Sequence, residues 1–162
     1  MQPQRAYVGL GANLGDAQAT LHGALRRIAA LPQTQLLRSS SFYRTAPVDA
    51  GGPDFVNAVA ELLTTLQPLA LLRALQAIEL EHGRQRPYRN APRTLDLDLL
   101  LHGDTRQDDP VLTLPHPRGH ERAFVLQPLA ELAPALTWPG RGAVAALAAA
   151  ITDQPIDKLP SP

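Results

Sequence analysis

The segment RTLDLDLLLHGD, residues 93–104, sets two carboxylates, Asp96 and Asp98, into a run of leucines. This alternation is typical of a β-strand, in which both aspartates project from one face and the intervening leucines project from the other, into a core. The two Cα atoms would lie roughly 6 to 7 Å apart, and negative charges at that distance repel each other unless a cation lies between them. A hard divalent ion such as Mg²⁺ prefers oxygen ligands and fits this gap. The alternative is a half-buried antiparallel strand whose polar face meets only water.

Four arginines lie within ten residues, from position 84 to the start of this segment, and no acidic residue separates them: Arg84, Arg86, Arg89 and Arg93. The guanidinium group is a planar fork of donors that matches phosphate oxygens. A metal ion together with cationic side chains is the usual apparatus of phosphoryl transfer. Taken alone, the arginines also suit a solvated loop or a nucleic-acid patch. Together with the carboxylate pair they favour chemistry on a metal-bound nucleotide.

Two further motifs carry weaker signals. The segment GLGANLG, residues 9–15, lacks the third glycine of a dinucleotide-binding fingerprint because Leu14 stands there, and no Gly-Lys-Ser/Thr follows it. We therefore interpret it as a turn between a strand and a helix. His116 lies between two prolines in LPHPRGHER, which would stiffen its backbone and hold the ring beside a phosphate. An incidental histidine is the alternative.

Composition limits the class of protein. A chain of 162 residues suits one domain, here residues 1–162, with a frayed tail at 155–162. Fifteen Lys and Arg balance fifteen Asp and Glu, so no overall field favours nucleic acid or an anionic membrane. The absence of cysteine excludes disulfides and thiolate chemistry. No leader pattern and no run of about 18 apolar residues occurs, so we expect a cytoplasmic protein.

The elements that must position these residues follow from periodicity. Apolar residues spaced by three and four predict helices at 16–31 and 68–83. Strands are predicted at 6–11, 35–45, 54–65 and 94–103, followed by a turn at 104–110, a short strand at 111–115 and helices around 119–133 and 142–151. The order strand, helix, strand, strand, helix, strand is typical of an α+β ferredoxin-like sandwich, with a mostly antiparallel sheet and both helices on one face. The other face would stay open for a ligand.

At this point the motifs resemble a known family, 6-hydroxymethyl-7,8-dihydropterin pyrophosphokinase of folate biosynthesis, in the same order from about residue 6 to 138. The motifs are GLGANLGD, SSFYRTAPV, DFVNAVAEL, RTLDLDLLLHG and LTLPHPRGHERAFVLQPLAELAP. The resemblance implies a ferredoxin-like fold and transfer of a pyrophosphoryl group from ATP to the pterin hydroxymethyl, with release of AMP. In such chemistry the protein contributes chiefly positioning and charge neutralisation.

The resemblance also implies roles for single residues. Asp96 and Asp98 would hold two Mg²⁺ ions that bridge the ATP phosphates, and the loop residues Arg84 and Arg93 would close on these phosphates. The remaining nucleotide contacts would be Gln76, Glu79, His116 and Arg122. The pterin pocket would comprise Asn57, which reads the ring edge, the aromatic residues Phe55 and Phe124, and the lining residues Thr45, Pro47 and Val48. A flat heterocycle needs stacking faces and a few hydrogen-bonding groups. For the two phenylalanines, core packing is the alternative.

Some positions depart from the family pattern. In RNAPR, Asn90 and Ala91 stand where the family has tryptophan and glycine, the loop is one residue shorter, and Pro87 stiffens it. Val111 replaces an arginine near the adenosine, and Pro117 replaces an aromatic residue. These changes concern the cap over the pterin and the nucleotide contacts more than the reaction.

Two other functions stay open at this point. A nucleic-acid-binding module would present basic and aromatic residues on the open face, whereas the chain has only one Trp, three Tyr and three Phe, and that face would carry two aspartates. A degenerate relative that binds ATP or pterin without turnover is the second alternative. The partners that we expect are ATP and the pterin, without nucleic acid or membrane, and we expect a monomer.

Overall fold

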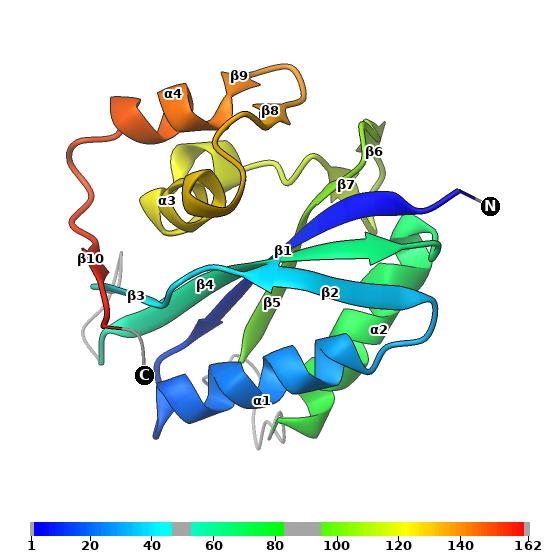
Figure 1. Cartoon of the computed structure of the whole chain (residues 1–162), viewed down its shortest axis with the longest axis horizontal. Coiled ribbons are helices and arrows are strands. Elements are labelled where there is room, and N and C mark those ends of the chain that lie inside the picture. Colours follow the sequence, from blue (N-terminus) through cyan, green and yellow to red (C-terminus); the bar gives the residue numbers. More distant parts are fainter. Residues whose placement is uncertain (1, 47–52, 83–94, 161–162) are drawn as a thin grey trace.

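The computed structural model describes residues 2–46, 53–82 and 95–160, and its centre is an antiparallel sheet (Figure 1). The sheet contains β1 (Gln4–Ala12), β2 (Thr34–Ser39), β3 (Tyr43–Thr45), β4 (Phe55–Thr64), β5 (Asp96–His102) and β10 (Asp157–Lys158). The strand order is β10-β3-β4-β1-β5, and β2 pairs with the far half of β4. Every pairing is antiparallel, which confirms the predicted sheet.

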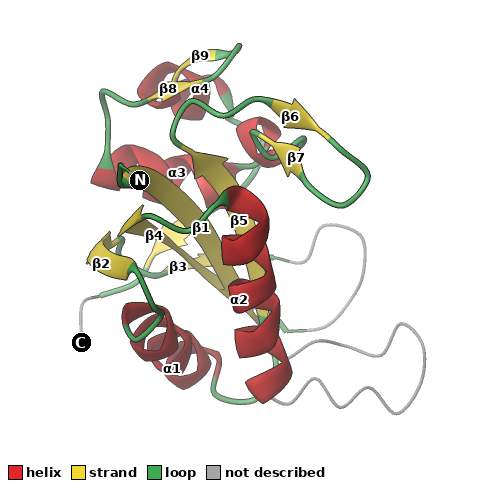
Figure 2. Ribbon diagram, turned by 90° about the vertical axis from the view of Figure 1, so that its right-hand side faces the viewer, coloured by secondary structure: helices red, strands yellow, loops and turns green. Residues whose placement is uncertain are grey.

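Helices α1 (Ala17–Ala29) and α2 (Pro68–Glu81) both pack on one face of the sheet, as predicted (Figures 1 and 2). The side chain of Asp16 caps α1 by accepting a hydrogen bond from the Ala19 N–H at 3.1 Å. Pro68 occupies the first turn of α2, where no backbone donor is lost. The main hydrophobic core lies between these helices and the sheet, and Leu95, Leu97 and Leu99 belong to it.

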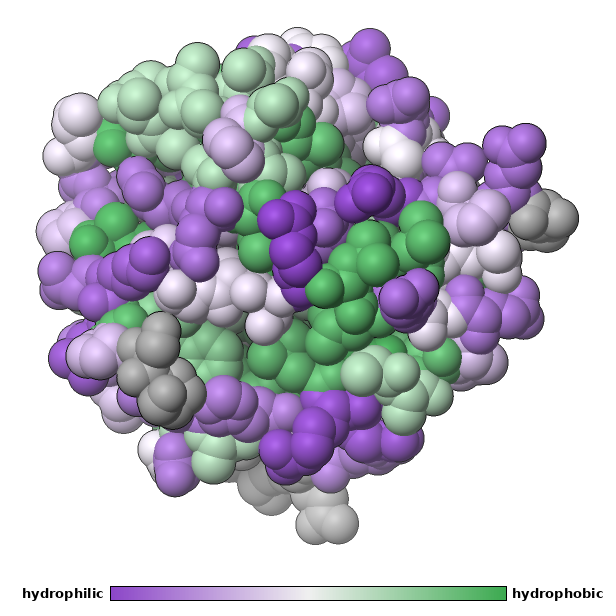
Figure 3. Space-filling model, viewed as in Figure 1, coloured by the Kyte–Doolittle hydropathy of each residue, from purple (hydrophilic) through white to green (hydrophobic). Residues whose placement is uncertain are grey.

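The opposite face is covered in part by α3 (Ala123–Leu132) and α4 (Val144–Ala150) (Figure 1). A second core joins Tyr7, Val59 and Leu101 of the sheet to α3, α4 and Trp138. The other elements here are β6 (Gln107–Asp108) with β7 (Thr113–Leu114), the 3-10 helix η1 (Gly119–Glu121), and β8 (Thr137–Trp138) with β9 (Gly142–Ala143). Apolar surface gathers over α4 in Figure 3, where the exposed positions are alanines. The second core therefore covers part of the sheet face that we expected to stay open.

Two predicted strands have different limits. The strand expected to break at the glycines continues to Ala12, because β1 is paired on both edges, with β4 and with β5. The turn comes at Gly15, which has a φ of 60°. The strand expected at 35–45 is divided into β2 and β3 by Ser40, whose hydroxyl accepts the Val59 N–H at 2.9 Å in place of a strand partner. The segment expected as a turn at 104–110 contains β6.

The expectation of a frayed tail is wrong for residues 157 and 158. They form β10, which pairs with β3, and the Leu159 N–H donates to the Phe42 carbonyl at 2.8 Å. The Leu159 side chain packs against the main core. The outer edge of β3 would otherwise expose unpaired backbone groups, and the tail satisfies them.

No helix among the described residues is long and apolar enough to cross a bilayer.

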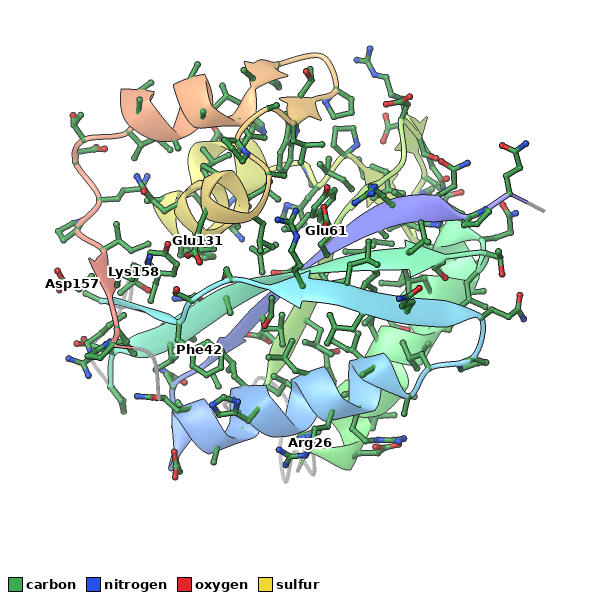
Figure 4. The ribbon with its side chains drawn as sticks, viewed as in Figure 1. Arg26, Phe42, Glu61, Glu131, Asp157 and Lys158 are labelled. Carbon is green, nitrogen blue, oxygen red and sulfur yellow. The ribbon has the colours of Figure 1, made fainter. Side chains whose placement is uncertain are left out.

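A buried carboxylate joins three strands on the second face. Glu61 of β4 accepts hydrogen bonds from the Tyr7 hydroxyl and from Arg38 Nε, the latter at 3.0 Å, and Arg5 lies 3.4 Å away. Burial raises the pKa of Glu61, but the hydrogen bonds from Tyr7 and Arg38 and the charges of Arg38 and Arg5 outweigh burial, so the pKa lies below its ordinary value. Glu61 therefore ties β1 and β2 to β4 as an ionised group (Figure 4).

Replacing Glu61 with glutamine should lower the free energy of unfolding by about 1–3 kcal/mol at neutral pH, because the Tyr7 hydroxyl and Arg38 lose a charged acceptor. A folded-state pKa below the unfolded one stabilises the fold above the unfolded pKa, and this contribution is lost as pH falls through the folded pKa. Urea unfolding of both proteins should thus show a difference that shrinks in acid. A difference that stays constant with pH would contradict this role.

Candidate active site

The register of β1 places the predicted site residues on one face of the sheet. Gly11 is opposite Asn57 of β4 and opposite Asp96 of β5, while Gly9 is opposite Asp98. Paired residues of antiparallel strands project from the same face. Asn57, Gly11 and Asp96 therefore form one row across three strands, and Asp98 lies in the neighbouring row.

On this face β1 carries two glycines, Gly9 and Gly11, which have no side chains. A Cβ added at Gly11 would be 3.0 Å from the Oδ1 atom of Asn57, which is tighter than an ordinary contact. β1 therefore contributes no side chain between the amide of Asn57 and the two aspartates, although Gly11 is buried and the Leu100 side chain lies 3.6 Å from the Cβ position of Gly9. The interpretation of these glycines as a turn missed this role. Their spacing of two residues within a strand is the signal that predicts a shared face.

A β-bulge in β5 explains why the leucines of this strand are buried on both faces of the sheet. The register with β1 shifts between Tyr7 and Val8, so one residue of β5 is extra at that point. Leu99 packs in the main core, whereas Leu100 and Leu101 both pack in the second core. Upstream of the bulge the predicted alternation holds, and Asp96 and Asp98 are half-buried on the face opposite the main core.

The aspartate pair has the donor chemistry that Mg²⁺ prefers. Among the described residues, no group of three or more His, Asp or Glu side chains could hold a metal ion. Mg²⁺ keeps several water ligands and is usually bound by one or two carboxylates together with phosphate oxygens of a substrate. Two carboxylates opposite two glycines therefore suit a metal ion that binds together with a polyphosphate. They do not form an all-protein cage.

Glu79 lies behind this pair, on α2. It is buried, and its Oε2 atom accepts the backbone N–H of Leu97 at 2.8 Å. Leu97 stands between the two aspartates on the edge strand, so this bond fixes the backbone from which both carboxylates project. Gln76 is half-buried one turn earlier and accepts a hydrogen bond from Arg73 at 3.2 Å. A nucleotide contact of Gln76 and Glu79 stays a prediction.

His116 is held next to the aspartates by backbone hydrogen bonds. The backbone N–H of His116 donates to the Leu100 carbonyl at 2.9 Å. The Nδ1 atom of its ring accepts the backbone N–H groups of Arg118 at 3.1 Å and Gly119 at 3.0 Å. Burial lowers the pKa of His116, Arg122 lowers it further, and Asp98 partly offsets both effects. The ring is therefore neutral at physiological pH, with its proton on Nε2 and available to a phosphate oxygen.

Arg122 and a cleft extend the cationic side of the site. Arg122 precedes α3, and its guanidinium carbon lies 5.5 Å from the centre of the Phe124 ring. Beside His116 a cleft of about 470 Å³ opens between the β6–β7 and β8–β9 hairpins, and Arg106 and Arg141 line it. Arg106 and Arg141 line the same cleft as His116, together with Asp108, and the excess of cations there favours an anionic ligand.

In the described part of the predicted pterin pocket, Asn57 and Thr45 form a hydrogen-bonded pair, and Phe55 is opposite Thr45 in the pairing of β3 with β4. Asn57 is buried, and its Nδ2 atom donates to the Thr45 hydroxyl at 2.8 Å. Phe55 and Phe124 are half-buried, and Phe124 packs against the second core. Stacking of either ring on a ligand stays a prediction. Several predicted residues lie outside the described part of the chain: Pro47, Val48, Arg84 and Arg93, together with the departures at Pro87, Asn90 and Ala91.

The tautomer of His116 can be tested in the metal-free protein. Nitrogen NMR should show an unprotonated Nδ1 and a protonated Nε2 at neutral pH, because two backbone N–H groups occupy Nδ1. The ring should acquire its second proton only below the ordinary histidine range, since burial opposes the charged form. Protonation of Nδ1 at neutral pH would contradict this arrangement.

Comparisons with known proteins show the family of this chain. The family model described as 7,8-dihydro-6-hydroxymethylpterin-pyrophosphokinase matches residues 7–134. The 2-amino-4-hydroxy-6-hydroxymethyldihydropteridine pyrophosphokinase of Pseudomonas aeruginosa is 49% identical over 158 residues, 97% of this chain and 98% of that protein. Its namesake in Haemophilus influenzae is 44% identical over 155 residues, 95% of this chain and 97% of that protein.

A solved structure shares the fold. The crystal structure of wild-type Plasmodium falciparum HPPK-DHPS with pteroate has a TM-score of 0.72 at 13% identity. It covers 91% of this chain and 42% of the other, so this chain spans less than half of that protein. At this identity the likeness shows the fold alone, whereas the family match and the two relatives show the membership. The chain belongs to the 7,8-dihydro-6-hydroxymethylpterin-pyrophosphokinase family.

Proposed function

We propose that this chain transfers pyrophosphate from ATP to 6-hydroxymethyl-7,8-dihydropterin in folate biosynthesis, giving AMP and the pterin diphosphate. The observation that carries the proposal is the row on the sheet, where Asn57 and Asp96 lie on either side of Gly11. An amide that can read a ring edge and a carboxylate that can hold a metal ion thereby project from the same face, on either side of a residue that has no side chain. Family membership supports the same reaction.

The spacing of the row suits a bicyclic substrate. Asn57 and Asp96 are two strands apart, which corresponds to roughly 9 to 10 Å. A pterin bound along this row would place its ring edge at Asn57 and Thr45, and its hydroxymethyl group toward the aspartates. The hydroxyl oxygen then loses its proton to solvent and forms a bond to the β-phosphorus of ATP, as the bond between that phosphorus and the α,β-bridging oxygen breaks and AMP leaves with that oxygen. The site contributes by holding both substrates in line.

Charge neutralisation is shared among several groups. Asp96 and Asp98 would hold Mg²⁺, and we propose two ions, which neutralise charge on the phosphates when bound. Nε2–H of His116 and the guanidinium of Arg122 would donate to phosphate oxygens. Arg84 and Arg93 would add cations from the loop outside the described residues. A monomeric state and a cytoplasmic location stay predictions.

The first experiment is a product assay. The purified protein is mixed with ATP, Mg²⁺ and 6-hydroxymethyl-7,8-dihydropterin, and the nucleotides are separated by chromatography. AMP that forms only with the pterin supports attack at the β-phosphorus, whereas ADP would mean a different reaction. If no nucleotide product forms, titrations with ATP and with the pterin separate a relative that only binds from a protein with another function.

Replacing Asp98 with alanine should reduce kcat/KM by more than about a hundredfold, because a carboxylate that holds Mg²⁺ on the phosphates is lost. The fold should be retained, since Asp98 is half-buried and outside both cores. Asp104→Asn is the matched control, because Asp104 is exposed beyond the end of β5, and it should keep the wild-type rate. Substantial Mg²⁺-dependent turnover by Asp98→Ala would refute the assigned role.

Replacing Asn57 with alanine should raise the KM for the pterin about tenfold or more, because the substrate loses a buried hydrogen-bonding partner. The KM for ATP should change little. Thr34→Val is a suitable control, since it removes a comparable bond, 2.8 Å to the Thr64 hydroxyl, at the opposite end of β4. Steady-state kinetics with each substrate varied in turn distinguish the two constants, and an equal rise in both would argue against a pterin contact.

A further inference from the structure

Strand β3 is short and carries one half of the polar pair. It contains three residues, Tyr43–Thr45, and Thr45 binds the amide of Asn57. Tyr43 is directly opposite Asn57 in the pairing with β4, so the two side chains lie on the same face. The position of β3 therefore sets the surroundings of Asn57.

Glu131 of α3 holds the start of this strand. One of its carboxylate oxygens accepts the Ser41 N–H and the Ser41 hydroxyl, both at 3.0 Å, and the other accepts the Tyr43 hydroxyl. Desolvation raises the pKa of Glu131, but these hydrogen bonds and the charge of Lys158 lower it below its ordinary value. Figure 4 shows Glu131 beneath α3, close to the labelled Lys158. The carboxylate is ionised, and both of its oxygens accept hydrogen bonds from the short segment that contains Ser41 and Tyr43.

The outer edge of β3 is held from the other side by the tail. Asp157 is paired with Arg44 and Lys158 with Tyr43, and the Leu159 N–H extends the pairing to Phe42. The tail reaches this edge after a turn anchored by Gln154, which binds the backbone of both Glu121 and Ala123 at the start of α3. Glu131 and β10 thus join the same strand to the same helix.

We propose that Glu131 and β10 form a clamp that positions β3, and through it Asn57, for pterin binding. This inference rests on the proposed function. Glu131 is a positioning residue, because its hydrogen bonds go to Ser41 and Tyr43, and β3 in turn contacts Asn57 through Thr45. The helix that carries Glu131 begins after Arg122 and includes Phe124, so the clamp also fixes the separation between that helix and the amide.

The test compares Glu131→Gln with the wild type at a temperature at which both are folded. Glutamine keeps the size of the side chain but loses the charge and one acceptor. The pterin Kd, measured with a nonhydrolysable ATP analogue present, should rise about three- to fivefold, a modest change because Glu131 is solvent-exposed. The Kd of the analogue should change by less than about twofold. Tyr43→Phe should act in the same direction and add little to Glu131→Gln, because both remove one network.

A second variant, lacking residues 156–162, removes β10 but keeps Gln154. It should weaken pterin binding in the same selective way. Arg27→Gln is the control, because it breaks an exposed pair with Glu81, at 2.6 and 2.7 Å, between α1 and α2 under the other face, and it should leave both Kd values unchanged. Unchanged pterin binding in Glu131→Gln and in the truncated protein would overturn the clamp. So would equal losses for pterin and nucleotide that follow the loss of thermal stability.

Failure of the clamp can be told apart from failure of the proposed function. If the wild-type protein binds no pterin, the proposed function falls, and the clamp's role in pterin binding falls with it. If the wild type binds pterin, hydrogen exchange of the ligand-free proteins adds an independent readout. Amides of Tyr43–Thr45 should exchange faster in Glu131→Gln than in the wild type, while those of β5 should not. Equal exchange in β3 would count against the clamp.

Discussion

The antiparallel pairing of β1 with β4 on one side and β5 on the other is the constraint on which the site depends. It brings an amide from one strand and two carboxylates from another to the same face, although they are about 40 residues apart in the chain. Because the side-chain period of a strand is two, a slip of one residue in either pairing would turn the amide or the carboxylates away. The glycines of β1 add no side chain between them.

Strands β5 and β3, which carry site residues, are each held by a side chain from a helix. Glu79 of α2 accepts a backbone N–H of β5 between the two aspartates, and Glu131 of α3 accepts donors at the start of β3. An open strand edge exposes unpaired groups and moves easily. These two glutamates therefore stabilise the strands at the points where the ligands of the proposed reaction would be held, and β10 completes the edge at β3.

The second face of the sheet combines a core with a site. Tyr7, Val59 and Leu101 pack in the second core with α3 and α4, and Val59 shares a row with Asp98 through Gly9. The bulge in β5 marks the boundary, since it turns Leu100 and Leu101 toward the second core while Asp96 and Asp98 keep the alternation. After β7 the chain returns to this boundary, where the backbone N–H of His116 donates to the Leu100 carbonyl. A rigid core next to the site is what holds a neutral imidazole beside the carboxylates.

The sequence by itself determined the features that depend on local period and on motif. Alternation placed Asp96 and Asp98 on one face, spacing of apolar residues predicted α1 and α2, and ordered motifs indicated the family. Only the tertiary structure decided what depends on partners distant in the chain. These features are the place of the β1 glycines between Asn57 and the aspartates, the division of β2 from β3, the pairing of the tail as β10, and the hydrogen bond from the Leu97 N–H to Glu79. The physical reason is that register and edge pairing are set by hydrogen bonds between strands, which no local pattern specifies.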